Sequence, residues 1–201
     1  MSHQAPDPRQ RIVAGAADMI RRRGLNATSV RDLAKHAQAP LGSTYHYFPG
    51  GKEQLATEAV QLAGDLVARI LRRELAAGPA AGLRAFLALW RDVVTGSDFR
   101  AGCPVLAVSI EDGAEGDPTP VVAAAADVFA TWRSLLAESL RAHGVERPEA
   151  GQLATLVVAA VEGAVVMCRA TRSAGPLDDV AAQLDALVSA AVGGGPAAGR
   201  S

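Results

Sequence analysis

The residues best suited to contact a nucleic acid lie together in the stretch GSTYHYFPGGKE, residues 42–53. Tyr45, His46 and Tyr47 are consecutive, although the whole chain has only two Tyr, two Trp and four Phe residues. Tyr hydroxyls and imidazole N–H groups can donate hydrogen bonds to phosphate oxygens and to base edges. We therefore predict that this run contacts DNA, and that the small Ser43 beside it lets a helix approach the bases closely.

Lys52 follows this run at a place where a further helix is expected to begin. An ammonium group beside the free amides of a helix N-terminus suits one DNA phosphate. The pair Gly51-Lys52 also occurs in ATP-binding phosphate loops, but those loops continue with Ser or Thr, and Glu53 follows here. We therefore reject nucleotide binding and predict that Lys52 contacts a phosphate of DNA.

No catalytic or metal-binding motif stands out along the chain. The sequence has no GxSxG elbow, no zinc-binding helix and no pair of carboxylates at catalytic spacing. A small hydrolase or transferase using His46 or His143 is the enzymatic alternative. Cys103 and Cys168 lie far apart without a neighbouring His, which argues against a zinc site or a disulfide framework. We predict buried free thiols, no metal, no cofactor and no enzymatic activity.

Helical periodicity extends through most of the sequence, in which 49% of the residues are hydrophobic. Gly and Pro residues separate the segments, and no β-branched run with period two persists. This pattern predicts an all-α fold, with a first helix ending at Arg23 and others at about 30–37, 40–48, 52–75, 81–95, 103–111, 118–143, 148–173 and 177–191.

The first three helices are expected to form a small helix-turn-helix head, whose third helix enters the major groove of DNA. Ser29 and Asp32 have the spacing of a capping box, in which each side chain bonds the backbone amide of the other residue. Residues 1–53 contain eight Lys or Arg against four Asp or Glu, a net charge of +4, whereas residues 54–201 carry −5. We predict a DNA-binding head at 1–53, a helical effector-binding and dimerisation body at 54–192, and a flexible tail at 193–201.

The expected helix at 148–173 is apolar on every face, so it must be covered on both sides. One side can face the core of its own chain and the other a second copy of the chain across a two-fold axis. Ala159 and Gly163, four residues apart, would let two backbones approach closely. We predict a homodimer with Ala159, Gly163 and Val166 at its interface. The alternative is a central helix wrapped within one subunit.

Three stretches together resemble the TetR family of bacterial repressors: TSVRDLA at 28–34, GSTYHYF at 42–48 and KEQL at 52–55. The stretch 39–55 and the tripeptide 102–104 are similar to the branch that includes LmrA and YxaF. The resemblance implies a homodimer that reads a double-stranded DNA operator, with a body that binds a small lipophilic effector. It implies DNA-facing positions at Thr28, Arg31, Leu41, Ser43, Tyr45, His46, Tyr47 and Lys52.

Two residues of the head depart from the family pattern. Thr44 stands where a larger aliphatic residue is usual, and Leu41 stands where the branch often has a cation. Leu41 could contact a thymine methyl group instead of a phosphate or a guanine. We therefore expect the preferred operator to differ from those of relatives.

Large apolar side chains of the body could line the effector pocket, although core packing is the default role for each of them. A buried indole N–H needs a hydrogen-bond partner, which a ligand could supply. A carboxylate inside an apolar helix needs either an arginine or a ligand. The ligand-binding residues predicted in this way are Phe86, Trp90, Phe99, Trp132, Glu162 and Met167. Without a usable pocket, the chain would be an architectural DNA binder.

The sequence also bears on the cellular location of the protein and on one acidic stretch between helices. No basic-then-apolar leader opens the chain, and Glu162 interrupts the most apolar stretch, 153–168. We therefore expect a cytoplasmic protein without a membrane segment. The acidic stretch 111–117 is interpreted as a solvated connection between helices.

Overall fold

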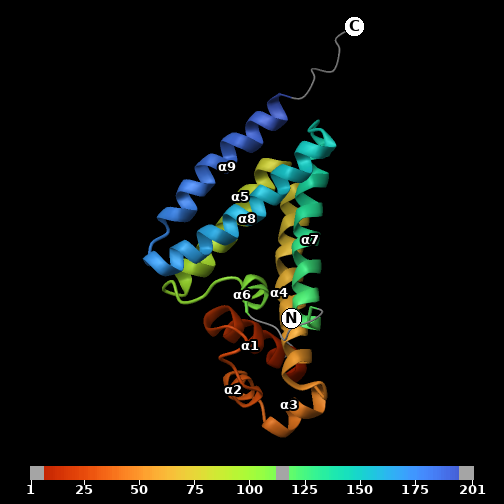
Figure 1. Cartoon of the computed structure of the whole chain (residues 1–201), viewed down its shortest axis with the longest axis vertical. Helices are drawn as coiled ribbons and strands as arrows, with labels where there is room; N and C mark the ends of the chain where they lie inside the picture. Colours follow the sequence, from red (N-terminus) through yellow and green to blue (C-terminus); the bar gives the residue numbers. More distant parts are fainter. Residues whose placement is uncertain (1–6, 112–117, 195–201) are drawn as a thin grey trace, which may run out of the picture. The chain divides into compact units, whose positions relative to one another are not determined.

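The structure is a computed structural model that describes residues 7–111 and 118–194 (Figure 1). These residues form α-helices without any strand, which confirms the expected all-α fold. The acidic stretch from 112 to 117 and the tail from 195 lie outside the described residues. The helices are α1 (Pro8–Arg23), α2 (Val30–His36), α3 (Leu41–Tyr47), α4 (Gly51–Leu75), α5 (Pro79–Gly96), α6 (Pro104–Ser109), α7 (Pro120–Ala142), α8 (Arg147–Thr171) and α9 (Gly175–Gly193).

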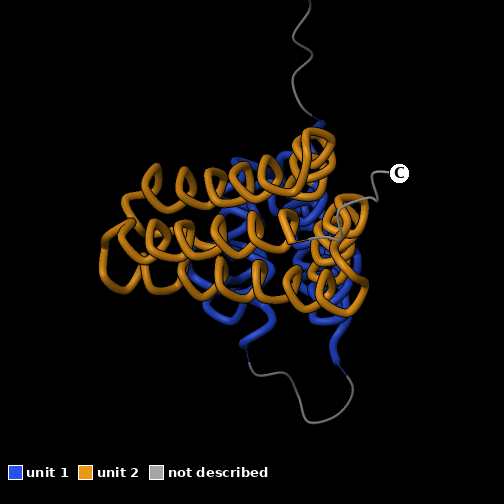
Figure 2. Tube along the Cα trace, turned by 90° about the horizontal axis from the view of Figure 1, so that it is seen from above, with its two compact units in different colours: residues 1–65, 103–128 blue, residues 66–102, 129–201 orange. Residues whose placement is uncertain are grey.

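The chain divides into two compact units (Figure 2). Unit 1 consists of residues 1–65 and 103–128, and unit 2 of residues 66–102 and 129–201. The helices α4 and α7 each begin in unit 1 and continue into unit 2. Unit 1 therefore contains the whole predicted head and, in addition, α6 and the start of α7.

The core of unit 1 forms where α1 packs against α2, α3 and α6. Ile12, Ile20 and Leu33 are completely buried there, and so is the ring of Phe48, which is 1% exposed. The Arg9 guanidinium lies 5.1 Å from the centroid of that ring and also pairs with Glu58 at 2.7 Å. The ring of Phe48 therefore belongs to the core of the head and not to its exposed surface.

The start of α2 has the predicted capping box. Ser29 Oγ accepts a hydrogen bond from the Asp32 amide at 3.1 Å, and Asp32 Oδ2 accepts one from the Ser29 amide at 3.2 Å. The Ser29 hydroxyl also donates to Asp32 Oδ2. These bonds hold the pKa of Asp32 below its ordinary value. They satisfy amides that a helix N-terminus leaves without partners, and thereby fix the residue at which α2 begins.

In unit 2, α8 packs against α5 and α9, and α5 also packs against α9, as the neighbouring ribbons in Figure 1 show. The buried residues of α8 include Val157, Val161 and Cys168. By length and composition alone, α7 and α8 could cross a membrane, which is weak evidence. Half of the most apolar window of α8 is buried inside the structure, as expected for the core helix of a globular protein.

Both cysteines are buried free thiols, as predicted. Cys103 is 4% exposed, and its Sγ accepts a hydrogen bond from the Leu106 amide at 3.4 Å at the start of α6. Burial raises the pKa of the Cys168 thiol. A raised pKa leaves little thiolate at neutral pH, so Cys168 has none of the character of a reactive cysteine.

Candidate nucleic-acid interface and effector site

The exposed surface of α3 carries the predicted aromatic run. Tyr45 is 53% exposed, His46 is exposed, and Tyr47 is half-buried. The rings of His46 and Tyr47 meet edge to face, with centroids 5.6 Å apart and planes at 64°. This part of α3 can therefore present hydroxyl and imidazole groups to phosphates and bases.

Thr44 orients α3 by supplying its buried side. It is 0% exposed, and its hydroxyl donates to the Pro40 carbonyl oxygen at 3.2 Å. A buried hydroxyl with a hydrogen-bond partner avoids the penalty of an unsatisfied polar group. Thr44 thus replaces a larger aliphatic residue without leaving its hydroxyl unpaired. On the same helix, Leu41 and Ser43 remain partly exposed.

Arg31 and Lys52 extend the candidate surface beyond α3. Arg31 is exposed on the first turn of α2. Lys52 is half-buried in the first turn of α4 and lines a cavity of about 260 Å³ together with Glu53 and Glu111. The ammonium group therefore lies at a helix N-terminus, as expected. It lies beside the carboxylate of Glu53, its neighbour in the sequence, and shares the cavity with Glu111, which the sequence did not place there.

Thr28 must be removed from the predicted DNA-contacting set. Its side chain is only 2% exposed, and its hydroxyl donates to the Gly24 carbonyl oxygen at 2.6 Å. A hydroxyl committed to that carbonyl and shielded from solvent is not available to a phosphate. Thr28 instead stabilises the turn between α1 and α2.

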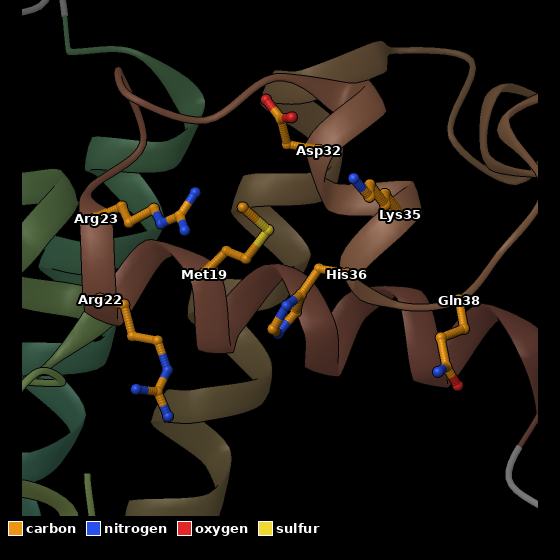
Figure 3. Close-up of a pocket in the computed structure, with 7 residues that line it drawn as sticks. All are labelled: Met19, Arg22, Arg23, Asp32, Lys35, His36 and Gln38. Carbon is orange, nitrogen blue, oxygen red and sulfur yellow. The ribbon is translucent and has the colours of Figure 1, made fainter. Parts of the chain in front are cut away.

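A basic cavity of about 450 Å³ lies between the end of α1 and α2 (Figure 3). Asp18 pairs with the neighbouring Arg21 and Arg22 at 2.6 and 3.1 Å, and His36 Nε2 lies 2.9 Å from its Oδ2. Burial alone would raise the pKa of Asp18, but the hydrogen bonds from the two arginines lower it overall. The residues around this cavity are Met19, Arg22, Arg23, Asp32, Lys35, His36 and Gln38.

In unit 2, aromatic rings from α5 and α7 form one cluster. Trp90 meets Phe86 and Trp132 with centroids 6.2 Å away in both cases, and Phe86 meets Trp132 at 5.8 Å. Phe129 adds a further edge-to-face contact with Trp132 at 5.6 Å. The predicted residues Phe86, Trp90 and Trp132 are therefore brought together. The sequence prediction missed Phe129. Its position three residues before Trp132 could have revealed it, because residues at this spacing are neighbours on a helix surface.

One polar atom in this cluster lacks a partner within the described residues. Trp90 is 3% exposed, and its Nε1 is buried without a hydrogen-bond acceptor. A buried donor of this kind costs about 1–3 kcal/mol unless something accepts from it. The indole N–H is thus a ready contact for the carbonyl or ether oxygen of a small molecule.

The remaining predicted ligand residues are Phe99, Glu162 and Met167. Phe99 is half-buried in the turn after α5, at a φ of 57°. Glu162 is buried in α8 at 4% exposure. Met167 is 56% exposed, so we move it from the predicted ligand set to the exposed face of α8.

That exposed face of α8 is apolar. Leu156, Val166 and Met167 are 46%, 47% and 56% exposed, and Ala159 and Gly163 lie exposed between them. A side chain built at Gly163 would meet nothing within 4 Å. The dimer residues predicted from the sequence therefore occupy an open apolar stripe on this helix, whose role as an interface stays a prediction.

His143, named for the enzymatic alternative, is engaged at the end of α7. Its Nδ1 lies 2.8 Å from the Ser139 carbonyl oxygen. No group of three or more His, Cys, Asp or Glu residues that could hold a metal occurs in the part of the chain that the structure describes. His143 acts as a helix C-terminal cap, a common role for this residue type.

The chain is similar to known regulators over nearly its whole length. A model described as bacterial regulatory proteins of the tetR family matches residues 12–59, and a model described as the C-terminal domain of LmrA/YxaF-like transcriptional regulators matches residues 79–183. An HTH-type transcriptional regulator of Mycobacterium tuberculosis is 44% identical over 186 residues, covering 91% of this chain and 95% of the relative. The HTH-type transcriptional regulator LmrA of Bacillus subtilis is 30% identical over 173 residues, covering 85% and 91%.

The fold also matches solved structures. A crystal structure of a TetR transcriptional regulator from Legionella pneumophila superposes with a TM-score of 0.81 at 20% identity, covering 93% of this chain and 99% of that one. At this identity the likeness establishes the arrangement of helices and nothing about ligands.

Proposed function

Since the chain belongs to the TetR family of bacterial transcriptional regulators, with an LmrA/YxaF-like C-terminal domain, we propose that it is a cytoplasmic repressor released from its operator by a small lipophilic effector. The observation that carries the DNA-binding part is the exposure of Tyr45 and His46 on α3, while Thr44 and Phe48 are buried behind them. This division presents one face of α3 to the major groove and keeps the other in the core.

Two copies of the head would read one operator. Regulators of this family bind DNA and form dimers, and the open apolar stripe on α8 supports the same assembly here. A two-fold dimer presents two α3 helices to successive major-groove faces, so we propose a near-palindromic operator.

The effector is proposed to bind within unit 2, next to the aromatic cluster of α5 and α7. Its rings offer an apolar wall, and the unpartnered Trp90 indole N–H offers a directional contact. A planar lipophilic molecule with one hydrogen-bond acceptor matches this chemistry. Such a ligand can weaken operator binding only if it binds the DNA-free state more tightly than the DNA-bound state.

The proposal is tested with DNA from upstream of the protein's own gene, in a mobility shift assay across a salt series. We expect sequence-selective binding that weakens steeply with salt, because cations of the head displace counterions from phosphates. A panel of planar lipophilic compounds should then include one that releases the complex. Absence of selective binding at every salt concentration would refute operator recognition. Selective binding that no compound affects would favour the effector-free architectural binder.

Trp90→Phe is expected to weaken the effector's binding by about 1–1.5 kcal/mol, the contribution of one hydrogen bond. Phe keeps an aromatic ring and removes only the indole N–H and part of the bicyclic area. The effector-induced rise in the melting temperature, measured by thermal shift, should shrink accordingly. Arg84→Lys, an exposed change on α5, serves as the control. An unaltered thermal shift in Trp90→Phe would place the effector away from this N–H.

A further inference from the structure

Glu111, just after α6, holds the turn between α1 and α2. Its Oε1 accepts a hydrogen bond from the Leu25 amide at 2.5 Å, and its Oε2 accepts one from the Asn26 amide at 2.6 Å. The two amides are consecutive, so both oxygens of one carboxylate are used on one short piece of backbone. Hydrogen bonds from amides to an ionised carboxylate are about twice as strong as those between neutral groups.

Gly24 makes this close approach possible. It ends α1 with a φ of 81°, in the region that favours glycine. A Cβ at this position would lie 2.2 Å from Glu111 Oε1. Gly24 is thus needed for two reasons: it adopts the backbone conformation of the turn, and its lack of a side chain leaves room for the carboxylate.

The turn held by Glu111 sets the start of α2. The Thr28 hydroxyl bonds back to the Gly24 carbonyl oxygen at 2.6 Å, and the Thr28 amide donates to the Leu25 carbonyl oxygen at 3.1 Å. The Ser29 capping box follows directly. A continuous series of hydrogen bonds therefore connects the Glu111 carboxylate, through the α1–α2 turn, to the first turn of α2. Arg31 lies on α2, and α3 follows it in the chain.

Glu111 is itself anchored by a packed helix. Val105 and Val108 of α6 are buried at 0% and 2% exposure, α6 packs against α1, and residues 103–128 belong to the same compact unit as the head. The carboxylate lies in the segment matched by the C-terminal family model, whereas the amides lie in the segment matched by the N-terminal one. A residue from outside the helix-turn-helix segment thus contributes to its internal geometry.

We propose that Glu111 is a positioning residue for DNA binding, whose carboxylate holds the α1–α2 turn in the geometry that operator recognition requires. This proposal rests on the proposed function, because it assigns a determinant of the same DNA-binding surface. It also corrects the interpretation of this acidic position as part of a solvated connection. Glu111 acts through the turn and needs no contact with DNA.

Whether removal of the Glu111 carboxylate weakens or strengthens DNA binding distinguishes this positioning role from a simple charge effect. Removing a carboxylate near a DNA-binding surface would by charge alone strengthen binding to the polyanion. Loss of the hydrogen bonds to the turn would weaken it. Glu111→Ala should therefore lower operator affinity, by about tenfold if one charge-assisted hydrogen bond is lost from the binding-competent state.

The test compares Glu111→Ala, Glu111→Gln and Glu53→Gln by fluorescence anisotropy on the operator fragment. Gln at position 111 keeps one acceptor oxygen, so its affinity should fall between those of Glu111→Ala and the wild type. Glu53 is exposed in the same cavity as Glu111 and its carboxylate holds no amide of the turn. Glu53→Gln should bind as tightly as the wild type or more tightly. Equal or tighter binding by both Glu111 variants would overturn the proposal.

Amide hydrogen exchange gives a readout that does not depend on the operator. In Glu111→Gln the amides of Leu25 and Asn26 should exchange faster, while those inside α1 keep their protection. Unchanged exchange at both amides would also overturn the proposal, and it would do so even if the wild type bound no operator. If Glu111→Ala failed to fold, the isosteric Gln variant would decide both measurements.

Discussion

Tyr45→Ala is expected to weaken operator binding by about 1–3 kcal/mol, the range for losing one base or close backbone contact. Its folding stability should stay close to that of the wild type. Tyr45 is 53% exposed, so its removal leaves little cavity, and Ala is the better helix former. Anisotropy titration on the operator measures the first quantity, and chemical denaturation followed by circular dichroism measures the second.

Phe48→Ala is the matched comparison, because Phe48 lies three residues from Tyr45 and its aromatic ring is buried, whereas Tyr45 is exposed. Phe48 is 1% exposed and the Arg9 guanidinium packs over its ring. Its removal should cost about 3–5 kcal/mol of stability, as for other buried Phe residues. If Tyr45→Ala lost as much stability as Phe48→Ala and retained its affinity for DNA, the proposed direction of α3 would be wrong.

Gly163→Leu is expected to convert the proposed dimer into folded monomers. The substitution has open space in the single chain, since nothing lies within 4 Å of a Cβ at Gly163, and Leu is a better helix former than Gly. At an interface with two-fold symmetry, however, both copies carry the extra side chain. Overpacking of about 1–3 kcal/mol per copy would then weaken association by about 2–6 kcal/mol. Sedimentation velocity over a concentration series measures the shift.

Gly151→Leu is the control for this experiment. Gly151 lies on the same helix, and a Cβ there would also meet nothing within 4 Å. It lies 12 residues, more than three helical turns, before Gly163, and five residues before Leu156, the first residue of the stripe. Gly151→Leu should remain dimeric and should bind the operator normally. A Gly163→Leu protein that dimerises as tightly as the wild type would exclude the α8 stripe as the interface.

Local patterns predicted the helices well because their causes are local. The capping box of Ser29 and Asp32 joins residues three apart, and the Pro and Gly residues that bound α5, α7 and α8 act on their own backbone. The buried side of α3 is set by Thr44 and Phe48, because a three-helix head this small needs part of that segment in its core. Once Thr44 and Phe48 are buried, helical geometry leaves Tyr45 and His46 exposed.

Thr28 and Met167 show where expectations from the sequence and the structure differ. The family resemblance implied a DNA contact for Thr28, but the backward turn at Gly24 places a carbonyl oxygen within reach of its hydroxyl. Met167 has the flexible apolar side chain of a pocket residue, yet its angular position on α8 puts it outside. In both cases the residue type was compatible with two roles, and the direction of the side chain decided between them.

The sequence by itself determined the all-α fold, the helix limits to within about two residues and the residues of the aromatic run, because helix formation and capping depend on interactions between residues a few positions apart. Its motifs also identified the family. Only the tertiary structure decided that Glu111 would meet amides some 85 positions earlier in the chain, and that Phe129 would join Phe86, Trp90 and Trp132 in one cluster. Such contacts arise when helices pack, and packing depends on the shapes of whole faces, which no short stretch of sequence contains.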